Sequence, residues 1–383
     1  MTPTCRAWPW PRPSRCARWW SRCGSNMAAA LRVGILGARR ALFMAGCRAA
    51  FPEQLVLAGV CDLRPERAEG AAQQHAIGKT YPTYEAMLAD KGIDLVVIGT
   101  PDHLHGEQAI QALEAGKHVL SEIPAAYTIE QLRRLVELEE RTGLKYAMGN
   151  EVRWFPYLEA AKKMADDGYW GRLFYSEAGY LHNLRLEGWR KTEPEDGAPH
   201  WRFDPRQPQT TFLGGGPHAF DTLRWLSGEQ NWVEVCAYGS VPYAEPHPEP
   251  AHAVALLKAE SGMITKIDCS YAMIRPYCLY FNLFGDQGTF ETSRSEAAGL
   301  FFSNKIPYMD RLEKLAVPYA TRPGHRAAGH GSSEVHMVED LLGAIVQDRP
   351  AAINAREAAR SIAPAICALE SIRTGKPVQI PPF

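Results

Sequence analysis

The sequence predicts an α/β protein in two parts: an N-terminal doubly wound parallel sheet, and a C-terminal α/β domain with an open, mainly antiparallel sheet. Up to about residue 150, apolar strand-like runs alternate with helical runs, which is typical of parallel strands joined by right-handed crossovers. After that point the strand-like runs lie closer together, and turn signals such as Glu260-Ser261-Gly262 indicate hairpins. A chain of 383 residues has room for both parts.

The first part, assigned to residues 28–150, follows from short apolar runs and the amphipathic segments between them. Pro65 stands where a proline favours the first turn of a helix. The expected strands cover 31–36, 55–61, 95–98, 118–120 and 146–148. The expected helices cover 41–50, the residues from Pro65 onward, 104–114 and 129–141.

The second part, 151–383, opens with a helix over 155–167 and ends with helices over 335–346 and 355–371. Residues 183–210 and 303–328 are long, irregular and contain prolines, and such loops commonly cover a functional site. The expected strands cover 174–182, 232–241, 251–260, 263–272, 278–286 and 288–292.

Residues 1–27 are left outside the predicted fold. They hold four tryptophans, five arginines and no acidic residue, and they lack the apolar segment of a secretory signal. We expect disorder here, or a natural translation start at Met27, although a basic segment of this kind is also compatible with a transit sequence.

The overall composition limits the possible partners and location of the protein. With a formal net charge of -1, nothing indicates binding to nucleic acid, and no apolar run approaches the length of a membrane span. The nine cysteines contain no C-x-x-C pair, so we expect reduced thiols in the cytoplasm and no zinc finger.

The end of the first strand carries a turn that suggests a dinucleotide site. In such turns glycine lets the backbone approach a pyrophosphate. Counted from Gly37, the G-x-G-x-x-G positions hold Gly37, Arg39 and Leu42, so only the first glycine is present. Arg39 and Arg40 are candidates for phosphate contacts; the alternative is a tight turn with solvated arginines.

Other candidate cofactor residues also follow strands, because ligands of parallel sheets bind beyond the carboxyl ends of the strands. Asp62 can accept hydrogen bonds from both ribose hydroxyls, which favours NAD over NADP, whereas the nearby Arg64 favours NADP. Three further candidates follow the strands at 95–98 and 118–120: Thr100, Pro101 and Glu122.

Three residues of the second part are candidates for acid–base chemistry. His218 follows a glycine run and opens a helix, so its imidazole can stand in a cleft; alternatively, it bonds only to backbone. Tyr180 and His182 alternate along one strand, so their side chains share a face and can relay a proton. The alternative is a pair of polar aromatics facing solvent. A metal site made of His182, His200 and His218 is disfavoured by its loose spacing, so we expect no metal.

The order and spacing of several short motifs, from about residue 31 to the C-terminus, resemble the Gfo/Idh/MocA family of glucose–fructose oxidoreductase, inositol dehydrogenases and relatives. This resemblance implies a Rossmann domain, NAD(P), a sugar or cyclitol-like substrate, and homo-oligomers formed through the face of the second-domain sheet. The motifs are VGILG at 33–37, CDLRPERA at 61–68, TPDHLH at 100–105, EAGKHVLSEIP at 114–124, RWFP at 153–156, WRFDP at 201–205, HAFDTLRWLSG at 218–228 and FGDQGTFE at 284–291.

The chain departs from this family at two acid–base positions. The dehydrogenases that this chain resembles carry an E-K-P motif, where this chain has Glu122-Ile123-Pro124. The isoleucine that replaces the lysine can neither move a proton nor stabilise charge. Many members also carry an aspartate where this chain has Gly214. The motif SEIPAA is more similar to a branch with E-V-P-A-A, which includes glycosidases that retain NAD as a catalyst.

The resemblance adds candidates near the substrate. His105 is assigned to the nicotinamide side of the cofactor, or caps its own helix. Asp221, one helical turn after His218, is a candidate to orient it, or is a structural partner of Arg224. The candidate substrate residues are Arg153, Trp201, Arg202, Asp221 and His330, and the last four each have a structural or solvated alternative.

The sequence is compatible with three functions. The first is an NAD-dependent oxidoreductase acting on a sugar or polyol hydroxyl, with His218 as the acid–base residue assisted by Tyr180 and His182. The second is a glycosidase or lyase that uses tightly bound NAD. The third is a non-catalytic nucleotide-binding relative.

Overall fold

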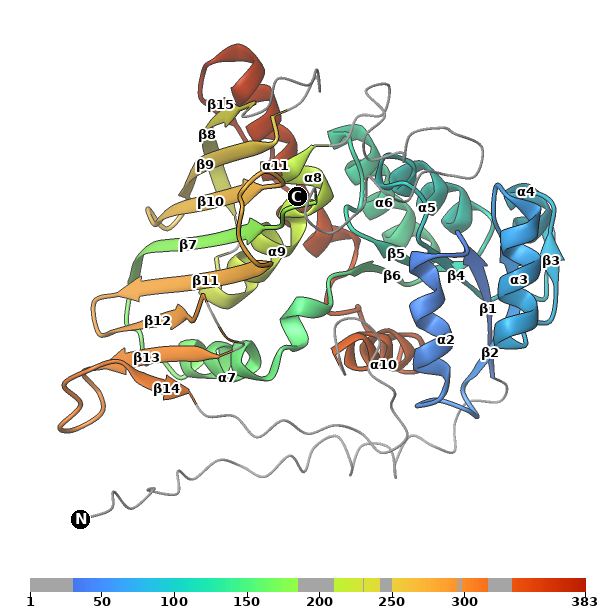
Figure 1. Cartoon of the computed structure of the whole chain (residues 1–383), viewed down its shortest axis with the longest axis horizontal. Helices are drawn as coiled ribbons and strands as arrows, with labels where there is room; N and C mark the ends of the chain where they lie inside the picture. Colours follow the sequence, from blue (N-terminus) through green and yellow to red (C-terminus); the bar gives the residue numbers. More distant parts are fainter. Residues whose placement is uncertain are drawn as a thin grey trace.

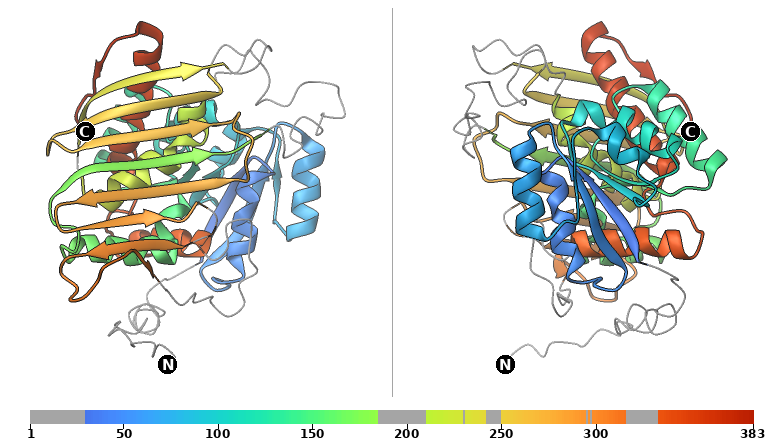
Figure 2. Two further views of the ribbon diagram at one scale, coloured as in Figure 1. Left: turned by 60° about the vertical axis from the view of Figure 1, so that its left-hand side comes forward. Right: turned by 90° about the vertical axis from the view of Figure 1, so that its right-hand side faces the viewer.

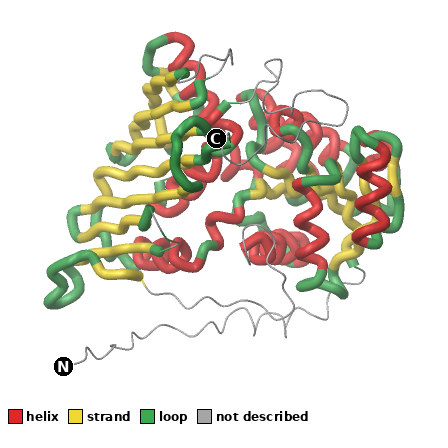
Figure 3. The backbone as a smooth tube through the Cα atoms, in the orientation of Figure 1, coloured by secondary structure: helices red, strands yellow, loops and turns green. Residues whose placement is uncertain are grey.

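The described residues form two β-sheets that lie side by side, with helices packed between them (Figure 1). Strands separate into the same two groups when the chain is coloured by secondary structure (Figure 3). The predicted α/β class with two sheets is confirmed. The computed structural model describes residues 30–184, 210–229, 231–241, 250–294, 296, 298–315 and 333–383.

The first sheet has the order β3-β2-β1-β4-β5-β6, and its strand pairs are parallel. β1 lies between β2 and β4, so the order reverses there, and this switch point is where such sheets bind ligands. β4 is buried along its whole length, as expected for a strand covered on both faces. The strands are β1 Leu31–Leu36, β2 Leu55–Cys61, β3 Thr80–Tyr81, β4 Leu95–Ile98, β5 His118–Glu122 and β6 Tyr146–Gly149.

The helices of this part begin and end at recognisable signals. For α6, the Thr128 side chain accepts a hydrogen bond from the Gln131 N–H at its start, and Gly143 adopts a left-handed conformation at its end. The helical elements are η1 Arg40–Leu42, α2 Phe43–Arg48, α3 Pro65–His75, α4 Tyr84–Ala89, η2 Asp102–Leu104, α5 His105–Glu114, α6 Ile129–Thr142 and η3 Glu151–Trp154.

The second sheet has the order β14-β13-β12-β11-β7-β10-β9-β8-β15. Its pairs are antiparallel except for β7 and β10, which agrees with the predicted mainly antiparallel sheet. Its strands are β7 Leu173–Leu181, β8 Trp232–Ser240, β9 His252–Ala259, β10 Ile264–Ser270, β11 Cys278–Gly285, β12 Gly288–Thr292, β13 Gly299–Ser303, β14 Glu313–Leu315 and β15 Val378–Gln379.

Helices cover one face of the second sheet and join it to the first part. The helices α9 and α11 pack on β7 and β8, and α11 also packs on α6, so one apolar core runs between the two sheets. Among the described residues, no helix covers the other face of this sheet (Figure 2, left). The helices are α7 Pro156–Asp166, α8 Thr211–Gly214, α9 Gly216–Ser227, α10 Ser333–Val346 and α11 Ala355–Thr374.

The helix α10 crosses back to the first part. It packs against α2 and η3, and Val338 and Leu341 belong to the apolar core beneath the first sheet. The first sheet ends at Gly149 and the second begins at Leu173, while α10 completes the core of the first part; the division into 28–150 and 151–383 stays a prediction. None of the helices in the described ranges is long and apolar enough to cross a bilayer.

Most predicted elements agree with the structure to within a few residues, and the misses are short. The prediction omitted the strands and helices β3, α4, α8, β13, β14 and β15 and the 3-10 turns η2 and η3, which have two to six residues each. The helix predicted over 41–50 begins as the 3-10 turn η1 and ends at Arg48. The loop predicted over 303–328 contains the short strand β14. Elements this short carry too little periodicity to be distinguished from loops.

Candidate active site

The turn after β1 is built around Gly37, whose φ of +93° lies in the region that favours glycine. A Cβ at this position would lie 2.7 Å from the Gly99 carbonyl oxygen, so a larger residue would have to displace the backbone that follows β4. The Gly37 N–H donates to the Cys61 carbonyl at 2.9 Å. The turn therefore joins the ends of β1, β2 and β4 at the switch point.

Asp62 holds this turn from the end of β2. Its Oδ2 accepts from the Ala38 N–H at 2.7 Å, and its Oδ1 accepts from the Arg64 N–H at 3.0 Å. Each carboxylate oxygen has a second lone pair, so these bonds leave acceptor capacity for ribose hydroxyls. Arg39 is exposed in the same turn. The assignment of Asp62 to ribose and of Arg39 to phosphate stays a prediction.

Arg40 has partners that the sequence did not indicate. Its Nε lies 2.8 Å from Glu122 Oε1, and its Nη1 lies 3.1 Å from Glu334 Oε1. The phosphate contact predicted for Arg40 must therefore compete with two carboxylates for the same guanidinium. Because Glu334 belongs to α10, these contacts fasten the turn after β1 to β5 and to α10.

We call Arg40, Glu122, Glu151 and Glu334 the acidic cluster. Glu151 and Glu334 are fully buried, and Glu122 is nearly so. Burial raises the pKa of Glu122 to about 7; Arg40 opposes this shift, while the charges of Glu151 and Glu334 add to it. Since one guanidinium faces three carboxyl groups, the cluster can hold or release a proton near neutral pH.

The predicted cofactor residues after β4 are fastened to their neighbours. The Thr100 hydroxyl donates to Gln108 Oε1 at 2.5 Å. The buried His105 ring joins two loops, with Nε2 2.9 Å from the Thr100 carbonyl oxygen and Nδ1 3.3 Å from that of Pro124. These contacts position the Thr100-Pro101 loop beside the end of β5. His105 therefore acts on the site by holding its loops.

We call Tyr180, His182, His218, Tyr271 and Tyr277 the aromatic cluster. Tyr180 Oη and His182 Nδ1 are 2.7 Å apart, and the Tyr180 ring stacks on the His218 ring with centroids 5.8 Å apart. The rings of Tyr271 and Tyr277 meet Tyr180 edge-on, and Tyr277 also contacts His182. The three residues predicted for acid–base chemistry are therefore brought together.

The glycine run before His218 has a packing reason. A Cβ at Gly215 would lie 2.2 Å from Cε1 of Tyr180, so glycine lets the Tyr180 ring pack at the start of α9. Thr210 caps the preceding α8 by accepting a hydrogen bond from the Leu213 N–H. The run fixes how β7 and α9 approach each other.

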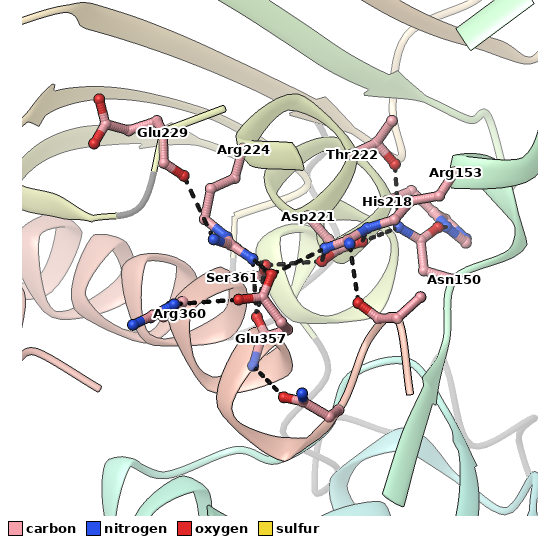
Figure 4. Close-up of polar contacts among 12 residues, drawn as sticks. Asn150, Arg153, His218, Asp221, Thr222, Arg224, Glu229, Glu357, Arg360 and Ser361 are labelled. Atoms are coloured by element: carbon pink, nitrogen blue, oxygen red, sulfur yellow. Dashed lines mark hydrogen bonds and ion pairs between the residues drawn. The ribbon is translucent and has the colours of Figure 1, made fainter. Parts of the chain in front are cut away.

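Behind His218 lies a chain of buried polar contacts that we call the His218 network (Figure 4). His218 Nδ1 and Asn150 Oδ1 are 2.7 Å apart. Asn150 Nδ2 donates to Asp221 Oδ2 at 2.7 Å and to Thr222 Oγ1 at 3.1 Å. Arg153 holds the same carboxylate with Nε 2.7 Å from Oδ2 and Nη2 2.5 Å from Oδ1.

This geometry revises two predicted substrate residues. Arg153 and Asp221 are buried and bonded to each other, so both face the interior of the protein. Asp221 reaches His218 only through Asn150. Burial alone would raise the pKa of Asp221, but Arg153, Arg224 and the Asn150 amide together hold it below its usual value. The two alternatives predicted for Asp221 were a role in orienting His218 and a pairing with Arg224. Arg224 acts on Asp221 through its charge, while its side chain contacts Ser361 and Glu357.

Asn150 and Glu151 were missed by the sequence reasoning, yet they join the two clusters. They directly follow β6, and Asn150 contacts His218 while the charge of Glu151 acts on both Glu122 and Arg40. Burial, Tyr180 and Glu151 also raise the pKa of Tyr277 well above its usual value. Their place at the carboxyl end of a parallel strand was the available signal.

Three of the predicted substrate residues, Trp201, Arg202 and His330, lie outside the described residues. So does His200, which the disfavoured metal site required. Within the described ranges, no group of three or more His, Cys, Asp or Glu side chains is arranged to hold a metal ion.

The residues at the switch point fit a dinucleotide. Gly37 lets the turn after β1 pack against the backbone at Gly99, as the tight turn of a dinucleotide site requires, and Asp62 stands at the end of β2, where such a site places a ribose. Thr100-Pro101 follows β4, and Glu122 is the last residue of β5. These strands lie between β1 and β6, the strand that precedes Asn150.

Comparison with curated proteins gives partial matches. The chain is 40% identical over 104 residues to an uncharacterized oxidoreductase, ORF334, of Rhizobium meliloti, covering 27% of this chain and 31% of that protein. It is 27% identical over 210 residues to the levoglucosan dehydrogenase of Pseudarthrobacter phenanthrenivorans, covering 55% and 52%. It is 29% identical over 182 residues to a glycosyl hydrolase family 109 protein of Shewanella sp. (strain MR-4), covering 45% and 39%. The matches thus span about a third to a half of these relatives.

The fold is shared over nearly the whole chain. A levoglucosan dehydrogenase solved with NADH has a TM-score of 0.78 at 21% identity, and the match covers 92% of this chain and all of that one. An oxidoreductase domain protein from Kribbella flavida has a TM-score of 0.80 at 22% identity with the same coverage.

Family models cover both parts of the chain. Residues 31–150 match the NAD-binding Rossmann fold of the GFO/IDH/MocA oxidoreductase family, and residues 158–291 match a C-terminal domain of the same family. The motif order, the two-sheet architecture and both matches agree, so the chain belongs to the Gfo/Idh/MocA oxidoreductase family.

Proposed function

We propose that this protein is an NAD-dependent oxidoreductase that acts on a hydroxyl group of a sugar or polyol. The observation that carries the proposal is the junction at Asn150-Glu151. These residues lie at the carboxyl end of β6, where a cofactor is expected, and Asn150 is bonded to His218 of the aromatic cluster. A group bound at the switch point would thus lie beside acid–base side chains of the second sheet.

When bound, the nicotinamide ring would accept a hydride from the carbon that carries the hydroxyl. The residues of this chain handle the proton. His218 is proposed to take the hydroxyl proton, since it meets Asn150 through Nδ1 and its other nitrogen, Nε2, can accept. Tyr180 and His182 are proposed to hold the neighbouring hydroxyl groups and to pass the proton onward. The tyrosine rings beside them offer apolar faces for a sugar ring.

NAD is favoured over NADP because Asp62 would place its carboxylate against a 2′-phosphate. The acidic cluster also supports a preference for the oxidised cofactor, because the nicotinamide ring is cationic only in that state. We expect Glu122→Gln to weaken binding of NAD+ several-fold and to leave NADH binding nearly unchanged, as measured by calorimetry at pH 8. Equal effects on both forms would contradict this role.

The proposed activity is tested by following NADH absorbance with aldoses, inositols and their 3-keto forms. We expect His218→Gln to lower kcat by about 10²–10⁴-fold with little change in the Kd of NAD, because only proton transfer is removed. Ser176→Ala, a change in a buried hydroxyl of the same strand as Tyr180, serves as the control. Failure to turn over any compound while NAD binds would support a non-catalytic relative.

A second candidate function is a glycosidase with retained NAD, and Ile123 is the observation that favours it. It occupies the position of the lysine in the family's E-K-P motif, and the match to a glycosyl hydrolase family 109 protein points the same way. In that reaction a sugar carbinol is oxidised transiently and the neighbouring C–H loses its proton. Elimination then breaks the glycosidic bond, water adds to the alkene, and the hydride is returned.

Mass spectrometry of gently purified protein distinguishes the two candidates. Stoichiometric retained NAD, aglycone release without net NADH, and solvent deuterium beside the oxidised carbon would establish the glycosidase. Protein that is isolated empty and binds NAD reversibly would favour the dehydrogenase.

We also propose that the protein forms homo-oligomers through the helix-free face of the second sheet. Tyr238, Leu256 and Ile264 are exposed there with 73%, 51% and 42% of their surface accessible. Light scattering should show a mass above 42.6 kDa that falls in Leu256→Lys. The control Leu63→Lys changes a side chain that is fully exposed elsewhere.

A further inference from the structure

We propose that Asn150 and Asp221 act as positioning residues that fix the tautomer of His218, placing the proton on Nδ1 and making Nε2 the nitrogen that receives the substrate's proton. The tautomer follows from the contacts of the His218 network alone. The role of Nε2 in proton transfer rests on the proposed function.

The inference starts at Asp221, which can only accept hydrogen bonds. Two guanidinium nitrogens of Arg153 hold its carboxylate, and the Ser361 hydroxyl donates to Oδ1 at 2.8 Å. The carboxylate is fully buried, and Arg153 is nearly so. The close pairing of Asp221 with Arg153 keeps the carboxylate ionised, so Asp221 presents lone pairs and no proton to Asn150.

The orientation of the Asn150 amide follows from this. An amide has one accepting oxygen and two donating N–H groups, and only the NH₂ end can bond to a carboxylate. Asn150 Nδ2 lies 2.7 Å from Asp221 Oδ2 and 3.1 Å from Thr222 Oγ1, which uses both of its N–H groups. If the amide were rotated by 180°, its oxygen would face the Asp221 carboxylate at hydrogen-bonding distance, which is repulsive. Oδ1 must therefore face His218.

The imidazole now has a single arrangement. Asn150 Oδ1 lies 2.7 Å from His218 Nδ1, and because this oxygen only accepts, Nδ1 must carry the proton. In the neutral ring Nε2 is then the acceptor. The chain of contacts runs from Arg153 on η3 to Asp221 on α9. It continues through Asn150, in the loop after β6, to His218 on α9.

An amide between carboxylate and imidazole also affects basicity. A carboxylate in direct contact would stabilise the imidazolium strongly, whereas an amide oxygen offers only a dipole. Among the described residues, Tyr180 stacks on the His218 ring, and Tyr180 in turn contacts His182. The arrangement therefore orients His218 through a dipole and not through a charge.

The direct test is the ¹⁵N NMR spectrum of the full-length protein labelled at histidine, with His218→Gln used to assign the signal. We expect a protonated Nδ1 and an unprotonated Nε2 in the neutral ring, which is opposite to the tautomer that free histidine prefers. A His218 signal with Nε2 protonated would overturn the proposal. This measurement needs no substrate, so it stands apart from the proposed function.

Two variants extend the test. Asn150→Ala removes the amide oxygen that accepts from Nδ1, so the NMR spectrum should show an increased share of the Nε2-protonated tautomer of His218, and kcat should fall while the Kd of NAD changes little. Asp221→Asn can present its own amide group and frees Asn150 to rotate, so both tautomers should be observed. An unchanged tautomer of His218 in a folded Asn150→Ala protein would count against the network.

Asn282→Ala provides the matched control. Asn282 is also buried, donates to a carboxylate, Glu177, at 2.8 Å and accepts from the Thr292 N–H at 3.0 Å. Asn282 lies on β11, and among the described residues its side chain bonds to these two. The Asn282→Ala variant should leave the His218 tautomer unchanged. If the Nδ1 proton is found but no tested carbohydrate is turned over, the tautomer assignment holds and the proposed function fails.

Discussion

The two buried charge clusters of this molecule are built differently. In the His218 network and its extension to α11, two arginines, Arg153 and Arg224, face two carboxylates, Asp221 and Glu357. In the acidic cluster, Arg40 faces three carboxyl groups. Among the described residues, the charges balance in the first set, whereas the second brings three carboxyl groups to one guanidinium.

This difference distinguishes charged groups that stabilise the fold from charged groups that are suited to proton transfer or ligand binding. Buried charges are tolerated where each is paired, and a balanced set then fixes geometry. An excess of like charge makes a group take up a proton, and such groups concentrate at functional sites. The structure places the balanced set behind His218 and the unbalanced set at the end of β5, where the cofactor is expected.

Breaking the balanced set should have the largest effect on stability. Arg153→Met removes the cation that holds Asp221 and leaves a buried carboxylate unpaired, so we expect a loss of about 3–5 kcal/mol in the free energy of unfolding. Urea denaturation at pH 7 measures it. Arg134→Met is the control, because Arg134 pairs with Glu114 and Glu137 at the surface, where about 1 kcal/mol or less is expected. Equal losses would mean that burial of the pair does not matter.

Neutralising Glu122, a member of the unbalanced set, should raise the free energy of unfolding and not lower it. Because burial raises the pKa of Glu122 from 4.5 to about 7, folding favours its protonated form. That stabilisation is fully present below pH 4.5 and is lost as the pH rises through about 7. We expect Glu122→Gln to be more stable than the natural protein by about 3 kcal/mol at pH 8, and to match it near pH 4.5.

Urea denaturation at several pH values between 4.5 and 8 tests this expectation. Glu137→Gln, at an exposed position of α6, serves as the control. A Glu122→Gln protein that is less stable than the natural one at pH 8 would show that the ion pair with Arg40 outweighs the burial of charge.

The sequence predicted the sheets and the aromatic cluster better than it predicted either charge cluster. Strand alternation placed Tyr180 and His182 on one face, and strand ends placed Glu122 at the carboxyl edge, because both follow from local periodicity. The partners of Arg40, Arg153 and Asp221 depend on contacts between residues far apart in the chain. Glu334 and Ser361 come from helices near the C-terminus, and no spacing in the sequence relates them to Arg40 or Asp221.

The smallest expected effect concerns a neutral member of the balanced set. The Ser361 hydroxyl donates to Asp221 and accepts from Arg224 Nε at 3.1 Å, so it links the two ion pairs. Ser361→Ala keeps every charge, and we expect a loss of about 1–2 kcal/mol from bonds to charged groups. Ser371→Ala on the same helix is the matched control: Ser371 is equally buried, but its partners are the neutral Lys376 carbonyl and Ala237 N–H. A larger loss in the free energy of unfolding for Ser371→Ala than for Ser361→Ala would show that the ion pairs gain nothing from the Ser361 hydroxyl. The hydrogen bonds of a buried serine on α11 would then account for the stability by themselves.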